Sequence, residues 1–174
     1  MILYNFIFLM VRKLRYGSRY QSSFIERLSP ASSIRLIGKS KIKLGYNIDI
    51  APHTRIEALH GGDIFIGDRT YINRDCIISC HKSVHIGKNC MFGPGVRIYD
   101  NNHKFSKDEG VSSKLKTGSI SIGDNCWIAS NAIILKGADI GNNCIIGVGC
   151  IIDYKIPDGS LVRLKQQHSV EQLR

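Results

Sequence analysis

The stretch IGDNCWIASNAIILKGADIGNNCIIGVGCII, residues 122–152, places an aliphatic residue at every sixth position. A small residue often follows these positions directly, and a second residue, Cys or Ala, stands four places beyond each of the first five. A period of six fits neither the 3.6-residue turn of a helix nor the alternation of a hairpin meander. It fits a chain that coils in three short sides, with the aliphatic side chains stacked inward from coil to coil. The aliphatic series is Ile122, Ile128, Ile134, Ile140, Ile146 and Ile152.

The same period begins much earlier in the chain and predicts one continuous parallel β-helix. Gly and Asn recur between the aliphatic positions, as in IGKN, IGDN and IGNN. Both residues suit tight corners that need a positive φ angle. The upstream series are Leu44, Ile50 and Ile56, then Ile66, Ile72, Ile78 and Val84, then Ile86, Phe92 and Ile98.

The chain has six cysteines, and five of them occupy the small position four places after an aliphatic residue. Other repeats use Thr, Ala or Val there, so we expect these thiols to be small buried core groups. There is no C-x-x-C pair, and reduced cysteines agree with a cytoplasmic protein. The five are Cys76, Cys90, Cys126, Cys144 and Cys150.

The pattern aliphatic–Gly–x–x–small–x resembles the hexapeptide-repeat acyltransferases, and residues 122–152 are similar to the acyl-CoA-binding coils of that family. The resemblance covers residues 34–158. It implies an all-β fold: a left-handed parallel β-helix of hexapeptide repeats with one protruding loop and short terminal helices, assembled as a homotrimer. We therefore expect an apolar and basic N-terminal segment (1–33), the β-helix acyltransferase domain (34–158) and a C-terminal tail (159–174).

The period breaks after Ile98, because the next aliphatic position is Ile122, a step of 24 residues where six would keep the period. The extra residues, 101–118, predict a loop that projects from the three-sided β-helix. The segment YDNNHKF at its start resembles the sugar O-acetyltransferase branch, in which D-x-x-H-x-F recurs. The resemblance implies that His103 is the general base that activates a sugar hydroxyl. Asp100 either orients that imidazole or serves as a turn residue.

A second motif nominates residues for the acceptor pocket. Residues 67–78, GDRTYINRDCII, resemble the family's G-x-x-x-Y-x-N element. This implies that Tyr71 and Asn73 line the acceptor pocket; the alternative for Tyr71 is simple packing at a corner. His81 stands where relatives often carry an Asp that contacts the acceptor sugar, so we expect a substrate contact there and a different acceptor.

The donor implied by the resemblance is acetyl-CoA, and no metal is expected. Trp127 occupies the family's W-I-[GA] position beside the acetyl-CoA channel. The relatives' closing G-x-P-A-[KR] segment is missing, so other cations are expected to hold the phosphates. The residues expected along the pantetheine arm are Ala129, Ser130, Gly147 and Val148, and those expected at the phosphates are Lys155, Arg163 and Lys165.

These features favour an acetyl-CoA-dependent O-acetyltransferase that modifies a saccharide hydroxyl in capsule or lipopolysaccharide O-antigen biosynthesis. The runner-up is N-acetylation of an amino-sugar nucleotide. A γ-type carbonic anhydrase shares the fold but needs three histidines on one zinc ion. His81 and His85 share a face of a strand yet lie roughly 13 Å apart, which argues against that enzyme. A non-enzymatic β-helix scaffold is the remaining alternative.

The net charge of +10 at pH 7 is concentrated at the N-terminus. Residues 1–43 carry nine Lys and Arg and one acid, a net charge of +8. The opening MILYNFIFLMVRKLR has an apolar run too short to span a bilayer of roughly 30 Å, and its positive charges follow the run, unlike those of a secretory signal. We expect a cytoplasmic protein without a nucleic-acid partner. Residues 1–19 either pack on the trimer or lie peripherally at the inner membrane face, where lipid-linked saccharide would be met.

Overall fold

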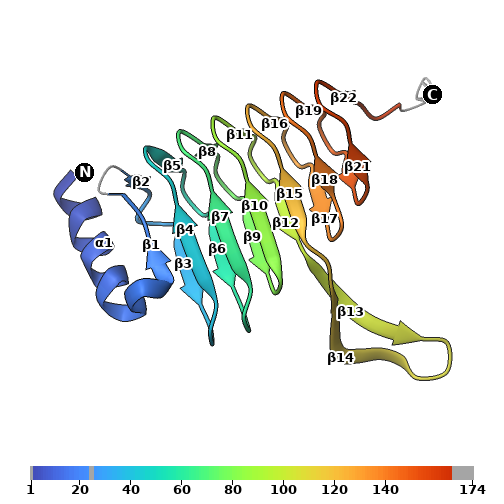
Figure 1. The fold of residues 1–174 in the computed structure, drawn as a ribbon, viewed down its shortest axis with the longest axis horizontal. Coiled ribbons are helices and arrows are strands. Elements are labelled where there is room, and N and C mark those ends of the chain that lie inside the picture. The colour runs from blue at the N-terminus through green and yellow to red at the C-terminus, as the bar shows by residue number, and fades with distance from the viewer. Residues whose placement is uncertain (1, 24–25, 166–174) are drawn as a thin grey trace, which may run out of the picture.

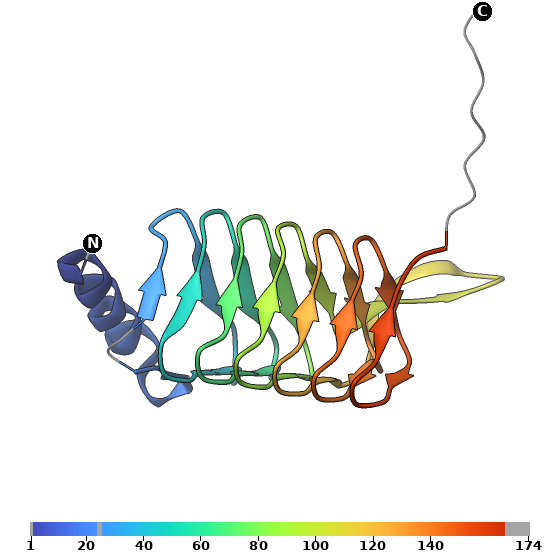
Figure 2. The same ribbon diagram turned by 90° about the horizontal axis from the view of Figure 1, so that it is seen from above.

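The computed structural model describes residues 2–23 and 26–165. These residues form a left-handed parallel β-helix whose three faces are sheets A, B and C (Figures 1 and 2). Sheet A contains β1 (Tyr20–Gln21), β4 (Lys41–Leu44), β7 (Asp63–Ile66), β10 (Ser83–Ile86), β15 (Ile120–Ile122), β18 (Asp139–Ile140) and β21 (Lys155–Ile156). Sheet B contains β2 (Glu26–Leu28), β5 (Ile48–Ile50), β8 (Tyr71–Ile72), β11 (Met91–Phe92), β16 (Trp127–Ile128), β19 (Ile145–Ile146) and β22 (Leu161–Val162). Sheet C contains β3 (Ser33–Leu36), β6 (Arg55–Ala58), β9 (Ile77–Cys80), β12 (Arg97–Tyr99), β17 (Ile133–Leu135) and β20 (Ile151–Ile152).

The aliphatic series of the sequence forms the stacked core of this solenoid. Ile122 pairs with Ile140 on sheet A, and Ile128 pairs with Ile146 on sheet B, one coil later in each case. These side chains are at most 1% exposed. Burying each contributes about 1.5–3 kcal/mol, so the inward ladder is the main source of stability. The predicted parallel β-helix is confirmed.

The corners of the coils make two different demands on the sequence. Asn125 and Asn143 take positive φ angles of 57° and 56°, the left-handed conformation that Asn tolerates. Gly123 has no such angle. A Cβ placed on it would lie 2.7 Å from the backbone carbon of Gly141 in the next coil. The glycine of IGDN therefore allows the coils to stack closely, while the asparagine makes the turn.

The six cysteines are buried and carry free thiols, as the repeat predicts. Their Sγ atoms reach backbone carbonyls of the adjoining coil; that of Cys126 lies 3.1 Å from the carbonyl oxygen of Gly141. Burial raises the pKa of the Cys76 thiol to about 11. These thiols act as small core groups that also satisfy corner carbonyls.

The segment that breaks the period is a two-stranded antiparallel hairpin, where the sequence predicted only a projecting loop. Strand β13 (Asn101–Ser106) pairs with β14 (Gly110–Thr117), with an irregularity in register between His103 and Phe105. Gly110 has a φ of 66°, which lets the chain reverse. The period of six carries no signal for antiparallel pairing, so the sequence predicts the projection of this segment but not its two strands. It projects from the corner between sheets C and A (Figure 1).

A helix covers the first coil, as the sequence predicts for the N-terminus. Helix α1 (Ile2–Tyr16) leads into a short 3-10 helix, η1 (Gly17–Arg19). Leu9 and Tyr16 are buried against the solenoid, and the Tyr16 hydroxyl donates to the carbonyl of Ile34 at 3.5 Å. No helix among the described residues has the length and apolar character needed to cross a membrane. At the other end the described chain forms β21 and β22. Residues 166–174 of the expected C-terminal tail (159–174) lie outside the described residues.

Candidate functional site

Asp100 lies fully buried at the corner from which the hairpin leaves sheet C. Its Oδ1 accepts the backbone N–H of His81 at 2.8 Å. Its Oδ2 accepts those of Lys82 and Ser83 at 2.6 and 3.0 Å. The carboxylate therefore fixes the turn of the preceding coil against the base of the hairpin. Asp100 also accepts from the Asn101 amide at 3.1 Å and the Cys80 thiol at 3.3 Å, so these contacts favour the second of its two expected roles, a turn residue, over orienting the His103 imidazole.

His103 lies exposed on β13, with its Nδ1 2.9 Å from the backbone carbonyl oxygen of Ser112 on β14. A carbonyl oxygen only accepts hydrogen bonds, so Nδ1 carries the proton and Nε2 keeps its lone pair in the neutral ring. The group that orients this imidazole is therefore the Ser112 carbonyl. The sequence pattern could not identify it, because the contact depends on the register of the hairpin.

Most of the residues expected to bind the donor line one groove of about 520 Å³ on sheet B and at the corner between sheets B and C. Trp127 stands in register with Ile145 and Leu161 on consecutive strands, and all three side chains are exposed. The expected residues in the lining are Trp127, Ala129, Gly147, Val148 and Arg163. The groove is also lined by four residues that the sequence motifs do not indicate: Ile145, Gly149, Leu161 and Leu164.

The groove suits a thin, largely apolar arm that ends in an anion. Gly147 gives one wall close backbone approach, since a Cβ on it would lie 2.9 Å from the carbonyl oxygen of Val162. Trp127 provides an exposed aromatic wall, and Arg163 supplies a cation. Ser130 lies beside the groove and accepts the N–H of Gly149 through its carbonyl at 3.1 Å. These residues fit a pantetheine arm and a phosphate.

Lys155 lies apart from this groove. It is on β21 of sheet A, where its Nζ is 3.8 Å from the Asp139 carboxylate. The groove is on sheet B, so a single chain does not bring Lys155 and Arg163 to the same phosphate position. Lys165 is exposed directly after the groove residue Leu164.

The two motif residues expected at the acceptor lie on or beside sheet B. Tyr71 pairs in register with Met91, which pairs with Trp127, so the three form one outward row. Asn73 lies in the turn after β8, where its Oδ1 accepts the N–H of Arg74 at 2.8 Å. Neither residue lies on the hairpin that carries His103.

His81 lies at the base of the hairpin, half-buried, with its ring stacked on that of His60 at a centroid distance of 5.7 Å. Burial lowers the pKa of His81, and the neighbouring His60 lowers it further, while Asp100 acts in the opposite direction. This position keeps a mostly neutral imidazole on the same corner as the hairpin that carries His103.

Two different corners of the prism thus carry the two halves of the expected site. The hairpin joins β12 to β15 at the corner between sheets C and A, and the groove follows β19 at the corner between sheets B and C. Figure 1 shows β13 and β14 extending away from β16, β19 and β22. One chain therefore does not bring His103 to the groove, but both corners flank sheet C.

The outward side chains of the last two strands of sheet C are apolar. Ile133 pairs with Arg97 on one side and with Ile151 on the other, so the three share one row. The Ile151 side chain is 57% exposed. Among the described residues, His, Cys, Asp and Glu form no group of three or more suited to a metal ion. His85, one of the histidines considered for zinc, stacks on Phe65 at 4.6 Å.

Comparison with known proteins agrees with this architecture. Residues 119–153 match the family described as bacterial transferase hexapeptide (six repeats). The chain is 28% identical to WbbJ, a proposed lipopolysaccharide biosynthesis O-acetyl transferase of Escherichia coli, over 70% of this chain and 66% of that protein. It is 29% identical to a galactoside O-acetyltransferase of Lactococcus lactis, over 74% of this chain and 62% of that protein.

A solved structure shows the same fold. A hexapeptide-repeat acetyltransferase of Vibrio cholerae, complexed with acetyl coenzyme A, superposes with a TM-score of 0.55 at 23% identity, over 73% of this chain and 64% of that one. The chain spans half to two thirds of the length of the first curated relatives it matches. The repeat match over residues 119–153, the solenoid and these likenesses agree in pointing to a hexapeptide-repeat transferase fold.

Proposed function

We propose that the chain is an acetyl-CoA-dependent O-acetyltransferase that modifies a saccharide hydroxyl in the biosynthesis of a surface polysaccharide, capsule or lipopolysaccharide O-antigen. Acetyl-CoA supplies the activated acetyl thioester. Nε2 of His103 accepts the hydroxyl proton as the new C–O bond forms and the C–S bond breaks. The imidazolium then returns the proton to the departing sulfur. The Ser112 carbonyl supports this role because it holds the proton on Nδ1.

The observation that carries the proposal is the assembly of Trp127, Gly147 and Arg163 in one groove, although 36 residues separate the first from the last. A narrow groove with an aromatic wall and a cation matches the chemistry of a pantetheine phosphate. The names of the relatives add support, because they describe O-acetyl transfer to a galactoside and in lipopolysaccharide biosynthesis. Both names describe O-acetyl transfer, and the one that mentions lipopolysaccharide biosynthesis supports a surface-polysaccharide acceptor.

The complete site is proposed to form between copies in a homotrimer. A three-fold axis facing sheet C places the corner between sheets C and A of one copy beside the corner between sheets B and C of its neighbour. His103 of one copy then faces the groove of the next. The exposed Ile151 and its register partner Ile133 support this arrangement, because contact between copies would cover both side chains.

The N-terminal helix is proposed to hold the enzyme peripherally on the inner membrane face, in the cytoplasm, where a lipid-linked acceptor would be found. Ile7, Met10, Val11 and Leu14 are exposed on α1, so its outward surface is apolar. Arg15 lies exposed in its last turn. An apolar helix face next to basic residues matches an anionic lipid surface.

The test is a screen of saccharide acceptors with acetyl-CoA, in which acetyl transfer is measured as the release of the free CoA thiol. We expect release above the hydrolysis background with hydroxyl acceptors, and an O-linked acetyl group that mild alkali removes. An alkali-stable acetyl group on an amino-sugar nucleotide would instead establish the runner-up, N-acetylation. Absence of release with every acceptor, by protein that binds acetyl-CoA, would contradict the proposal.

A further inference from the structure

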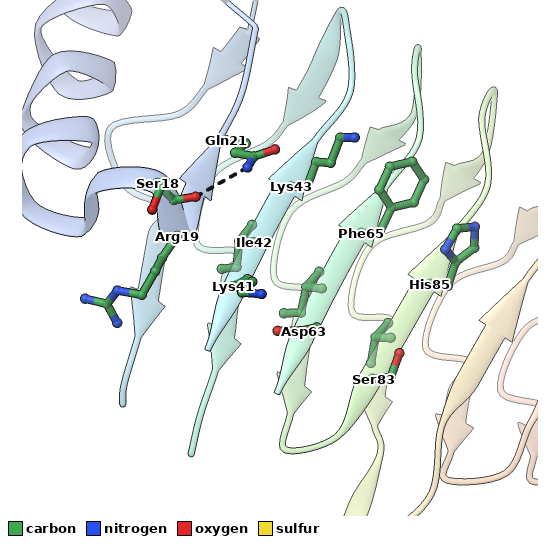
Figure 3. A pocket seen from close by; sticks show the side chains of 12 residues that line it. Ser18, Arg19, Gln21, Lys41, Ile42, Lys43, Asp63, Phe65, Ser83 and His85 are labelled. Carbon is green, nitrogen blue, oxygen red and sulfur yellow. Dashed lines mark hydrogen bonds between the residues drawn. The ribbon is translucent and has the colours of Figure 1, made fainter. Parts of the chain in front are cut away.

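A shallow cleft of about 280 Å³ lies on sheet A beside η1, apart from the donor groove on sheet B (Figure 3). Outward side chains of four adjoining strands form it, in two rows fixed by the register of the sheet. One row contains Gln21, Lys43, Phe65 and His85. The other contains Lys41, Asp63 and Ser83.

The first row contains two aromatic rings that stack on one another. The rings of Phe65 and His85 stack with centroids 4.6 Å apart and planes 16° apart. The Nζ of Lys43 lies 5.8 Å from the centre of the Phe65 ring (Figure 3). The outward edges of the stacked rings offer apolar surface that can pack against the C–H groups of a sugar ring. The ammonium group beside it would then meet an anionic substituent of that ring.

The cleft carries an excess of positive charge. Its lining includes three cations, Arg19, Lys41 and Lys43, and one carboxylate, Asp63. None of the ion pairs among the described residues uses these three cations. The Arg19 guanidinium donates to the Gly38 carbonyl at one end of the cleft. The two lysines therefore remain available to an anion from solution.

The cleft leads toward the proposed catalytic corner. Ser83 lines it, and the backbone N–H of Ser83 donates to the Asp100 carboxylate at the base of the hairpin at 3.0 Å. Sheet A also stays polar on its outer side beyond the cleft, with Ser121, Asp139 and Lys155 on the later strands. The exposed apolar rows lie on sheets B and C, so contact between copies through sheet C leaves the cleft open.

We infer that this cleft binds an anionic sugar residue of the acceptor, a ring that carries a carboxylate or a phosphate, at a distance from the hydroxyl that is acetylated. The ring packs across the outward edges of Phe65 and His85, and Lys41 and Lys43 neutralise its charge. This inference rests on the proposed saccharide acetyltransferase function. It narrows the acceptor class to acidic or phosphorylated saccharides.

The experiment is a chemical-shift titration of the full chain, without acetyl-CoA, with three probes: tetragalacturonate, glucose 1-phosphate and neutral maltotetraose. We expect at least one anionic probe to bind more tightly than maltotetraose. Lys43→Gln and Phe65→Leu should each weaken that probe about tenfold, the loss of one charge-assisted or stacking contact. Lys39→Gln, a change of the same charge at an exposed lysine outside the cleft, should leave the affinity unchanged.

Tighter binding of tetragalacturonate identifies an acidic residue within a glycan chain, and tighter binding of glucose 1-phosphate identifies a glycosyl phosphate. Equal affinity for maltotetraose, or anionic binding that survives both cleft variants, would overturn the inference. Because the titration involves no turnover, its result is separate from that of the acetyl-transfer screen. Transfer to a saccharide without cleft binding would remove the subsite alone, and cleft binding without any transfer would remove the catalytic proposal alone.

Discussion

The carboxylate of Asp100 lies 2.6 Å from the backbone nitrogen of Lys82, a residue of the preceding coil, and so ties the base of the hairpin to the solenoid. The same carboxylate serves the N–H groups of His81 and Ser83. Asp100 is fully buried. Truncation of this side chain would leave three partly buried N–H groups without their acceptor, and a fully buried group left so costs about 1–3 kcal/mol.

Asp100→Ala is therefore expected to lower the free energy of unfolding by about 3 kcal/mol or more, measured by urea denaturation. Asp108→Ala, at an exposed position in the turn of the hairpin, serves as the control and should change it by less than about 0.5 kcal/mol. If both variants unfold at the same urea concentration as the parent chain, the role assigned to Asp100 is wrong.

Gly123 tests the close stacking of coils. A Cβ at this position meets the backbone of Gly141 at 2.7 Å, so Gly123→Ala forces the two coils apart. We expect a loss of about 1–3 kcal/mol in the free energy of unfolding, as for an overpacked core. Gly118→Ala is the comparison, because its nearest neighbours stand 3.3 Å away. A smaller loss for Gly123→Ala than for Gly118→Ala would refute the explanation.

The sequence predicted the solenoid because each coil repeats the same physical requirement. An inward aliphatic side chain, a close-packed small residue and a left-handed corner recur in register, so Ile122 and Ile140 are placed by one rule. The first coil departs from that rule. Its buried residues Tyr20, Leu28 and Leu36 are eight apart, so the strands begin ahead of the repeat that starts near residue 34.

The candidate site was only partly predictable for the same reason. Trp127 and Gly147 are expected beside the donor from the family resemblance, and both line one groove. The partner of His103 is set by hairpin pairing, and the burial of Asp100 is set by the corner where the period stops. The hexapeptide period therefore predicts neither the partner of His103 nor the burial of Asp100. Lys155 was nominated as a substitute for the missing phosphate-binding segment, and its position on sheet A separates it from the groove.

The trimer predicts that sheet C carries the contact between copies. The parent chain should sediment at three times the chain mass of 19.4 kDa. Ile151 is 57% exposed and pairs with Ile133 on sheet C. Ile151→Glu places a charge in the proposed contact, and we expect it to shift the sedimentation profile toward the monomer. Tyr46→Glu, at an exposed position on the corner between sheets A and B, is the control. A parent chain that is a stable monomer at micromolar concentration would rule the trimer out.

Membrane contact predicts co-sedimentation with anionic vesicles. The parent chain should bind vesicles that contain phosphatidylglycerol and should not bind vesicles of phosphatidylcholine alone. Leu14 is 82% exposed and Met10 lies one turn before it, so Leu14→Gln with Met10→Gln should weaken vesicle binding without unfolding the chain. Val148→Gln, an exposed apolar residue far from α1, should not. Equal vesicle binding by the α1 variant and the parent would contradict the proposed contact.

The most direct test of the account is the turnover of His103→Ala with acetyl-CoA and an acceptor from the saccharide screen. Loss of the base should lower kcat by about 10²–10⁴ while the KM for acetyl-CoA changes little, because the residues that line the groove stay unchanged. His53→Asn, at an exposed corner with a positive φ that Asn accepts, should retain the parent rate. Near-normal turnover of His103→Ala would contradict the central claim.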